Sequence, residues 1–216
     1  MQDLFAADEL EEPRKLELGP SLVLLRRRAL PVASGLLAVI AKVAAKAPFR
    51  RMITPGGFEM SVAMTNCGRA GWITDRSGYR YDPLDPLTGE PWPPLPDLFR
   101  SLAGESAAEA GFAGFVPDGC LINRYEPGTR LSLHQDRNER DYSQPIVSVS
   151  LGLPATFQFG GAARSDKTIR VPLRHGDIVV WGGVARLAHH GVLALKEGHH
   201  PATGPLRFNL TLRKAL

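Results

Sequence analysis

The stretch Leu131-Ser132-Leu133-His134-Gln135-Asp136 is the starting point for predicting the fold. Its alternating apolar and polar residues predict the end of a β-strand. Because successive strand side chains point to opposite faces, His134 and Asp136 are expected on the same face. An imidazole nitrogen and a carboxylate oxygen placed in this way can share a metal ion. A second His would complete the two-His, one-carboxylate set that holds Fe(II) and leaves coordination positions open.

The sequence around this stretch predicts a mainly β fold with flanking helices (α+β). Short apolar segments are separated by turns rich in Gly, Pro and Asp, which is typical of a sandwich, barrel or jelly roll. The eight expected strands are Cys120–Tyr125, Leu131–His134, Ile146–Leu151, Ala155–Phe159, Thr168–Pro172, Ile178–Trp181, Ala188–Val192 and Leu206–Arg213. Helices are expected before them, from Ser34 up to Pro48 and from Asp97 to Ala110.

The last expected strand carries a second group of polar residues on one face. That face is formed by Arg207, Asn209, Thr211 and Arg213, and the apolar face by Leu206, Phe208, Leu210 and Leu212. Guanidinium groups form bidentate hydrogen bonds to carboxylates, so this polar face can hold a dicarboxylate. Asn123 and Tyr125 alternate in the same way along the first strand. The alternative is an ordinary half-exposed strand with its polar face in water.

The spacing of residues does not decide which His completes the metal site. The candidates are His175, His189, His190, His199 and His200. His190 is favoured because it lies at the start of an expected strand. His189 is the immediate competitor, and a strand would point the two neighbours in opposite directions, so only one of them can bind.

Composition limits the class of protein. A chain of 216 residues most often forms one domain. No apolar run approaches the roughly 20 residues of a membrane span, and the first residues do not resemble a secretory signal. Only two Cys occur, which predicts a reducing, cytoplasmic location and no disulfide framework.

Charge is distributed unevenly along the chain. Residues 1–12 hold five acidic side chains and no basic one, so the remainder has 26 basic against 17 acidic residues, a balance of +9. A basic body suits a polyanionic partner such as nucleic acid, although a basic protein without that partner would look the same. We expect residues 1–20 to form an acidic, mobile leader and residues 21–216 to form a single domain.

Residues 49–94 are rich in Gly and Pro and predict turns and short strands. Trp72, Tyr79 and Tyr81 fall in this segment, interleaved with Arg69, Arg76 and Arg80. Aromatic rings and Arg together are typical of surfaces that stack bases and contact phosphates. The alternative is that the rings only anchor long loops to the core.

Seven segments carry a resemblance to a known family. They are Met64–Gly68, Cys120–Tyr125, Leu131–Asp136, Ile146–Gly152, Phe157–Gly161, Gly176–Gly183 and Arg207–Arg213. In sequence and in order they resemble the AlkB-type Fe(II)/2-oxoglutarate-dependent dioxygenases, in particular the bacterial branch that repairs alkylated DNA. The resemblance covers most of the chain from about Met52 to Arg213.

This resemblance implies a double-stranded β-helix, or jelly roll, over about residues 117–214, with a nucleotide-recognition lid over about residues 50–94. The residues implied to bind iron are His134, Asp136 and His190. Those implied to hold 2-oxoglutarate are Asn123, Tyr125, Arg207, Asn209 and Arg213, of which Arg213 is also expected to be catalytic. Those implied to contact the substrate nucleotide are Thr54, Met64, Trp72, Tyr79, Tyr81, Asn138 and Arg164.

The resemblance also implies an activity: a monomeric enzyme that uses Fe(II), 2-oxoglutarate and O₂ to demethylate N1-methyladenine and N3-methylcytosine. The expected products are formaldehyde, succinate and CO₂, and the expected substrate is DNA, preferably single-stranded, with double-stranded DNA and RNA as further candidates. Asn138 departs from the family, whose repair branch often has an acid there, and His189 stands where an aromatic residue is common. The alternatives are a hydroxylase of the same type that acts on a protein or small molecule, and a non-enzymatic metal-binding jelly roll.

Overall fold

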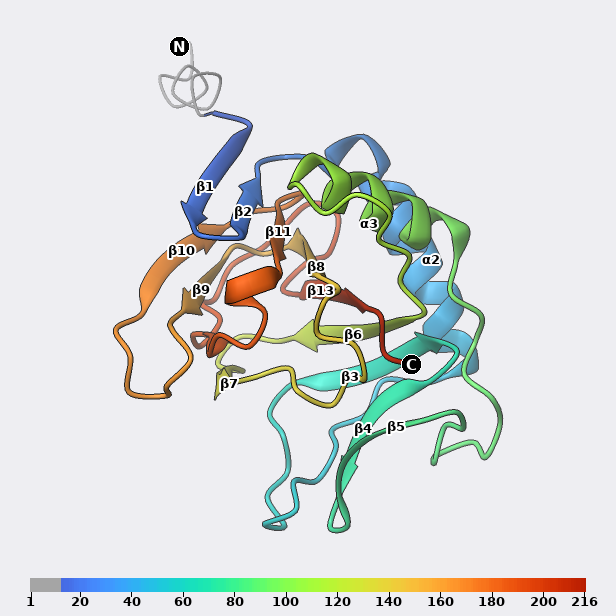
Figure 1. Cartoon of the computed structure of the whole chain (residues 1–216). Helices are drawn as coiled ribbons and strands as arrows, with labels where there is room; N and C mark the ends of the chain where they lie inside the picture. The colour runs from blue at the N-terminus through green and yellow to red at the C-terminus, as the bar shows by residue number, and fades with distance from the viewer. Residues whose placement is uncertain (1–12) are drawn as a thin grey trace.

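The computed structural model describes residues 13–216, which contain two large antiparallel sheets (Figure 1). The larger sheet has seven strands, in the spatial order β1 (Lys15–Gly19), β2 (Leu22–Leu25), β11 (Ile178–Trp181), β8 (Ile146–Gly152), β13 (Arg207–Arg213), β6 (Gly119–Tyr125) and β3 (Ala63–Gly68). The smaller sheet has four strands, in the order β10 (Ile169–Leu173), β9 (Ala155–Phe159), β12 (His190–Val192) and β7 (Leu131–His134).

The strands from β6 to β13 form a double-stranded β-helix. Along the chain, β6, β8, β11 and β13 belong to the larger sheet, whereas β7, β9, β10 and β12 belong to the smaller one. The chain therefore crosses repeatedly between two four-stranded layers, β11-β8-β13-β6 and β10-β9-β12-β7. This arrangement is a jelly roll, which confirms the expected fold class.

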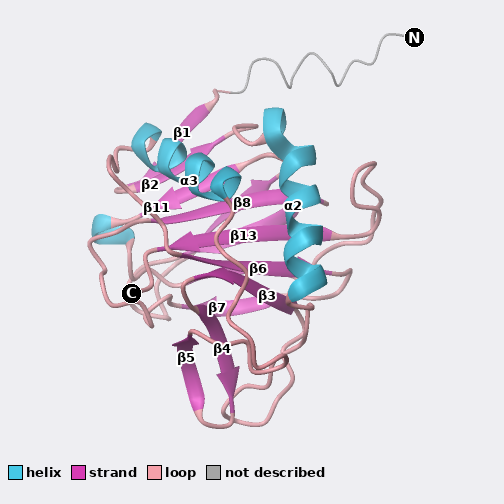
Figure 2. Ribbon diagram, turned by 90° about the vertical axis from the view of Figure 1, so that its right-hand side faces the viewer, coloured by secondary structure: helices cyan, strands magenta, loops and turns pink. Residues whose placement is uncertain are grey.

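Two helices cover the outer face of the larger sheet (Figure 2). Helices α2 (Ala33–Lys46) and α3 (Asp97–Glu109) contribute Leu36 and Phe99 to a buried apolar cluster that also contains Leu210 and Leu212 of β13. Since Leu210 and Leu212 face the helices, the alternate residues of β13 are turned to the opposite face, toward the smaller sheet. None of the helices in residues 13–216 is long and apolar enough to cross a membrane.

A separate hairpin lies beyond the edge of the larger sheet. Strands β4 (Gly71–Asp75) and β5 (Gly78–Asp82) pair only with each other among the described residues, and they project away from the sheets in Figures 1 and 2. Two short 3₁₀ turns, η1 (Leu30–Val32) and η2 (Gly183–Ala185), complete the regular structure.

The structure corrects two of the expected boundaries. The acidic leader was expected to extend to residue 20, but residues 15–19 form β1 and pair with β2. Residues 1–12 lie outside the described part of the chain. The lid expected over about residues 50–94 is also too wide. Residues 63–68 form β3, the edge strand of the larger sheet, where their backbone pairs with β6 and five of the six are buried. Short strands were expected in this segment, but the pairing of one of them with the larger sheet was not.

Candidate active site

A cavity of about 940 Å³ lies between the two sheets and the β4–β5 hairpin. Its walls include residues of β3, β4, β5, β6, β7, β12 and β13. With the exception of Tyr81, every residue expected to bind metal, 2-oxoglutarate or substrate lines this cavity. The jelly roll therefore gathers into one space residues that are up to 159 positions apart in the sequence, from Thr54 to Arg213.

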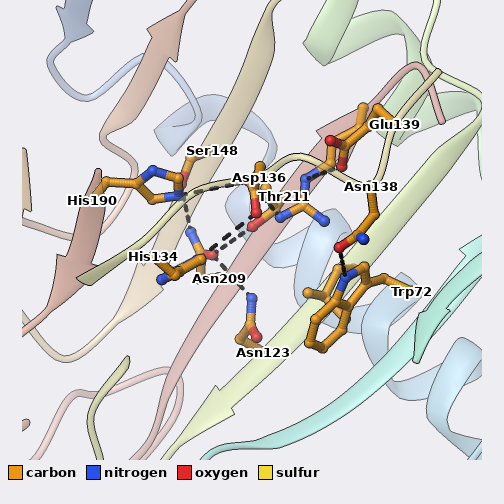
Figure 3. A network of polar contacts seen from close by, with 12 residues as sticks. Trp72, Asn123, His134, Asp136, Asn138, Glu139, Ser148, His190, Asn209 and Thr211 are labelled. Atoms are coloured by element: carbon orange, nitrogen blue, oxygen red, sulfur yellow. Dashed lines mark hydrogen bonds and ion pairs between the residues drawn. The ribbon is translucent and has the colours of Figure 1, made fainter. Parts of the chain in front are cut away.

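Three of these residues form a candidate metal site. His134, Asp136 and His190 each offer one ligand atom, and these atoms lie within 4.8 Å of one another. The Nε2 atom of His134 is 3.8 Å from one carboxylate oxygen of Asp136, and Nε2 of His190 is 3.6 Å from the other. Figure 3 shows the three side chains pointing toward one another. Two imidazoles and one carboxylate in this arrangement fit Fe(II) and leave one side open.

Strand pairing explains why His190 and not His189 joins the site. His190 is the cross-strand partner of His134, and a bulge follows it between His190 and Val192. At this bulge a Cβ on Gly191 would lie 2.7 Å from the carbonyl oxygen of Leu131, so glycine permits the close approach of the two strands. The expectation that His190 is favoured over its neighbour agrees with this pairing.

The protonation of both imidazoles suits metal binding. Nδ1 of His134 lies 2.8 Å from the carbonyl oxygen of Ser132, and Nδ1 of His190 lies 3.0 Å from that of Ala188. A carbonyl oxygen only accepts, so each Nδ1 carries the hydrogen and each Nε2 keeps its lone pair. Burial, together with the neighbouring His190, lowers the pKa of His134 to about 4, which keeps this ring neutral.

Asp136 is held in its ionised form by an arginine from β13. Nη2 of Arg213 donates to Oδ2 of Asp136 at 2.6 Å. Burial opposes ionisation, but the neighbouring Arg213 guanidinium holds the pKa of Asp136 well below its usual range. The metal site thus presents a charged carboxylate whose orientation is already fixed.

At the opposite end of β13, Arg207 is buried with an incomplete set of partners. Its side chain is almost inaccessible, and its Nη2 donates to Ser150 Oγ at 3.0 Å. Within the described residues, Nε and Nη1 of Arg207 and the hydroxyl of Tyr125 have no hydrogen-bond partner. Burial lowers the pKa of Arg207 and raises that of Tyr125 to about 12, so the first keeps a costly charge and the second keeps its proton. These bare donors fit one end of a dicarboxylate.

Between the two arginines lies a row of amides and hydroxyls. Nδ2 of Asn209 donates to Ser148 Oγ at 2.8 Å, and Oδ1 of Asn209 accepts from Asn123 Nδ2 at 3.3 Å. The other amide atom of Asn123, Oδ1, has no partner among the described residues. The alternative of a half-exposed last strand is therefore wrong, because its polar face is buried and turned into the cavity.

Two aromatic rings of the hairpin line the cavity. Trp72 and Tyr79 are stacked, with centroids 5.7 Å apart and ring planes at 22°. Trp72 Nε1 donates to Asn138 Oδ1 at 3.1 Å, and Arg164 Nη1 donates to the carbonyl oxygen of Leu133. Both rings line the cavity. The alternative that they only anchor loops does not account for this position.

Tyr81 differs in position from the other residues expected to contact the substrate. It is not among the residues that line the cavity, and its hydroxyl donates to Glu139 Oε1 at 2.6 Å. Ser148 and Ser150 were not predicted from the sequence, although their alternation along an apolar strand could have revealed them. Glu139 and Arg186, which are both buried near the metal site, gave no sequence signal.

A jelly roll that holds two His and one Asp beside a buried, incompletely paired Arg defines an Fe(II)- and 2-oxoglutarate-dependent dioxygenase. The comparison with known families agrees. The sequence model of the 2OG-Fe(II) oxygenase superfamily matches residues 27–213, and the chain belongs to this superfamily. The expected cofactor and cosubstrates, Fe(II), 2-oxoglutarate and O₂, are confirmed at this level.

Individual relatives narrow the class further. The chain is 58% identical over 215 residues to "Alpha-ketoglutarate-dependent dioxygenase AlkB" of Salmonella typhimurium strain LT2, covering 100% of this chain and 98% of that protein. It is 55% identical over 216 residues to the protein of the same name in Escherichia coli strain K12, with the same coverage. A solved structure of OsALKBH1 matches with a TM-score of 0.80 at 28% identity, covering 93% of this chain and 99% of that one. The resemblance to AlkB-type dioxygenases is thereby confirmed.

Proposed function

We propose that this protein reverses alkylation damage by oxidative demethylation of N1-methyladenine and N3-methylcytosine in DNA, with RNA as a further substrate. The observation that carries the proposal is the single cavity that joins the stacked pair Trp72 and Tyr79 to His134, Asp136 and His190. The high identity to two bacterial dioxygenases named AlkB supports the same activity.

Within this proposal, His134, Asp136 and His190 hold the iron. Arg207 and Tyr125, whose polar atoms lack partners, receive the far carboxylate of 2-oxoglutarate, because a buried cation without a counter-charge is costly. Arg213 fixes Asp136 and contacts the cosubstrate on the iron side.

Asn123 and Asn209 line the path between the two arginines and keep the cosubstrate in one orientation. Fe(II), 2-oxoglutarate and O₂ supply the oxidation that converts the N-methyl group to N-hydroxymethyl, with succinate and CO₂ as coproducts; the hydroxymethyl group then leaves as formaldehyde.

The substrate side of the cavity supplies stacking surfaces for a base turned out of its strand. Trp72 and Tyr79 offer the faces of two rings, and the half-exposed His134 forms part of the opposite wall. A methyl group at N1 of adenine or N3 of cytosine blocks pairing, which lowers the few kcal/mol that base extrusion normally costs. The other cavity-lining residues expected to contact the nucleotide, Thr54, Met64, Asn138 and Arg164, keep this role in the proposal, whereas Tyr81 loses it.

We also propose single-stranded DNA as the preferred form, a monomer as the active state and the cytoplasm as the location. A single chain supplies all the residues of the proposed site, which supports a monomer. Extruding a base from a single strand avoids the loss of a base pair, which supports the strand preference. The two cysteines are free thiols, which suits a reducing compartment.

Formaldehyde release tests the proposal most directly. The purified protein is mixed anaerobically with Fe(II) and 2-oxoglutarate, and air is then admitted with a single-stranded oligonucleotide carrying one N1-methyladenine or one N3-methylcytosine. We expect formaldehyde from either base and none from His134→Ala. Succinate without formaldehyde would remove the nucleobase from the proposal and favour a protein or small-molecule substrate. The ratio of formaldehyde yields from the two bases gives the base preference of an enzyme that has an amide, Asn138, at this position.

A further inference from the structure

The unexpected direction of Tyr81 places the hairpin in contact with the metal site. Tyr81 is the cross-strand partner of Trp72, so the two residues belong to the same face of one small sheet. Its hydroxyl donates to Glu139 at 2.6 Å and accepts from Nη1 of Arg213 at 3.2 Å. The hairpin that presents Trp72 to the cavity is therefore tied, through Tyr81, to the arginine that holds the metal ligand Asp136 (Figure 3 shows Glu139, Asp136 and Trp72 in one view).

Glu139 connects this tyrosine to a second arginine. Its Oε1 accepts from Tyr81 and lies 3.5 Å from Nε of Arg213, while its Oε2 accepts from Nη2 of Arg186 at 3.1 Å. Arg186 in turn donates through Nη1 to the backbone carbonyl of Asp136 at 2.7 Å. Both the carboxylate and the backbone of Asp136 are thus held by guanidinium groups that meet at Glu139.

The composition of this group argues for a role in orientation. It contains two acids and two arginines, all nearly inaccessible to solvent, and a phenol whose pKa burial raises well above its usual value. Buried ion pairs are weak contributors to stability, and well-packed apolar residues often replace them without loss. Hydrogen bonds from Arg186 and Arg213 reach the backbone carbonyl and the carboxylate of Asp136, so the network holds both ends of this metal ligand in place.

We propose that Tyr81, Glu139 and Arg186 are positioning residues that couple the seating of the β4–β5 hairpin to the orientation of Asp136. When the hairpin is seated, the Tyr81 hydroxyl donates a hydrogen bond to Glu139. Glu139 then holds Arg186 and Arg213 in place. When the hairpin lifts, Glu139 loses one donor and Asp136 loses its fixed orientation. This proposal rests on the proposed function, in which the hairpin rings Trp72 and Tyr79 stack on the substrate base. It makes oxidation of the cosubstrate depend on how the hairpin is seated.

The test compares two tyrosines in the same region. Tyr81→Phe removes the hydroxyl that reaches Glu139. Tyr142→Phe is the matched control, because it removes a hydroxyl that donates to the backbone carbonyl of Arg137 at 2.7 Å but keeps the ring that lies beside Arg186. Each variant is titrated with Co(II), whose visible absorption reports the geometry of its ligands, before and after addition of a methylated single-stranded oligonucleotide. Formaldehyde released per succinate formed is then measured with Fe(II), and thermal unfolding is recorded for each variant.

We expect Tyr81→Phe to bind Co(II) severalfold more weakly with an altered spectrum, and to release severalfold less formaldehyde per succinate. Tyr142→Phe should match the wild type in all three readouts. Glu139→Gln keeps the shape but removes the charge; it should reproduce the Tyr81→Phe defects and serves as the second variant should Tyr81→Phe not fold.

The proposal would be overturned if Tyr81→Phe had the cobalt spectrum of the wild type and the same ratio of formaldehyde to succinate. The same holds for Glu139→Gln where that variant replaces Tyr81→Phe. The network would then have a purely structural role. If the wild type itself releases no formaldehyde, the proposed function fails, whereas the cobalt titration still decides whether these residues position Asp136.

Discussion

The two ends of β13 differ in a way that the strand itself does not suggest. Arg207 and Arg213 lie on the same face, and both are buried, at 1% and 4% exposure. Arg213 meets Asp136, Tyr81 and Glu139, whereas the only hydrogen bond that the structure describes for the Arg207 side chain is the one to Ser150. The charge of Arg213 is matched by Asp136 and Glu139 before any ligand binds, while Arg207 has no ionic partner among the described residues. One end is built for rigidity and the other for binding.

Arg213→Met should produce the largest effect, because it removes the arginine whose charge is already matched within the protein. Removing one partner of a buried ion pair leaves an uncompensated charge, here on Asp136. We expect the free energy of unfolding of the metal-free protein to fall by about 3–5 kcal/mol. Urea denaturation followed by circular dichroism measures it. A loss below about 1 kcal/mol, the range of exposed ion pairs, would mean that Asp136 is satisfied without Arg213.

Arg207→Met should leave stability intact and weaken cosubstrate binding. In the metal-free protein it removes a charge without a counter-charge, so the free energy of unfolding should stay unchanged or rise. The affinity for 2-oxoglutarate, measured by calorimetry with Mn(II) in the site, should fall about 30-fold or more, as when one partner of a buried charge pair is truncated. Arg164→Met is the control, because Arg164 lines the same cavity but contacts the backbone of Leu133. Equal losses in both variants would contradict a specific role for Arg207.

The smallest effect concerns acidification at the Arg207 end. Gly152, the cross-strand partner of Arg207, donates its N–H to Nδ1 of His175 at 2.9 Å. Burial, with His200 nearby, lowers the pKa of His175 in the folded protein. Its unfolded pKa is about 6.5, so the unfolded chain takes up the proton first and stability is lost as the pH falls below that value.

The measurement is the free energy of unfolding of the metal-free protein between pH 7.5 and 5.5. His175→Asn keeps an acceptor near the Nδ1 position but cannot titrate, so its stability should decline less over this range. His199→Asn, at an exposed position, should keep the wild-type decline. If the free energy of unfolding declined equally in all three proteins, His175 would not contribute to the pH dependence of stability at the Arg207 end.

Alternation along single strands was sufficient to predict much of this site. The polar faces of the first and last jelly-roll strands gave Asn123, Tyr125, Arg207, Asn209 and Arg213, because period-two patterns survive in any sheet. The pair His134 and Asp136 followed from the same rule. What the pattern could not supply was pairing between strands, which decided between His189 and His190 and made residues 15–19 a strand.

The contact between the hairpin residue Tyr81 and Glu139 could not be predicted, for a different reason. Tyr79 and Tyr81 are equivalent in sequence terms, yet one lines the cavity and the other reaches Glu139. The outcome depends on how the hairpin sits against the loop after β7, which involves contacts between residues far apart in the chain. Glu139 and Arg186 are charged residues in loops, and such residues are usually exposed, so no local signal marked them as buried.

The position of β13 has a consequence for how the protein is made. It is the last strand in chain order, yet it lies inside the larger sheet, paired with β6 on one side and β8 on the other. Without residues 207–213, no described strand connects β6 to β8, so the sheet is divided into two parts with open edges. Such non-local pairing is slow and leaves strand edges exposed to aggregation. The cavity is thus completed only after synthesis has passed Arg213, because Arg207, Asn209 and Arg213 all lie on this strand.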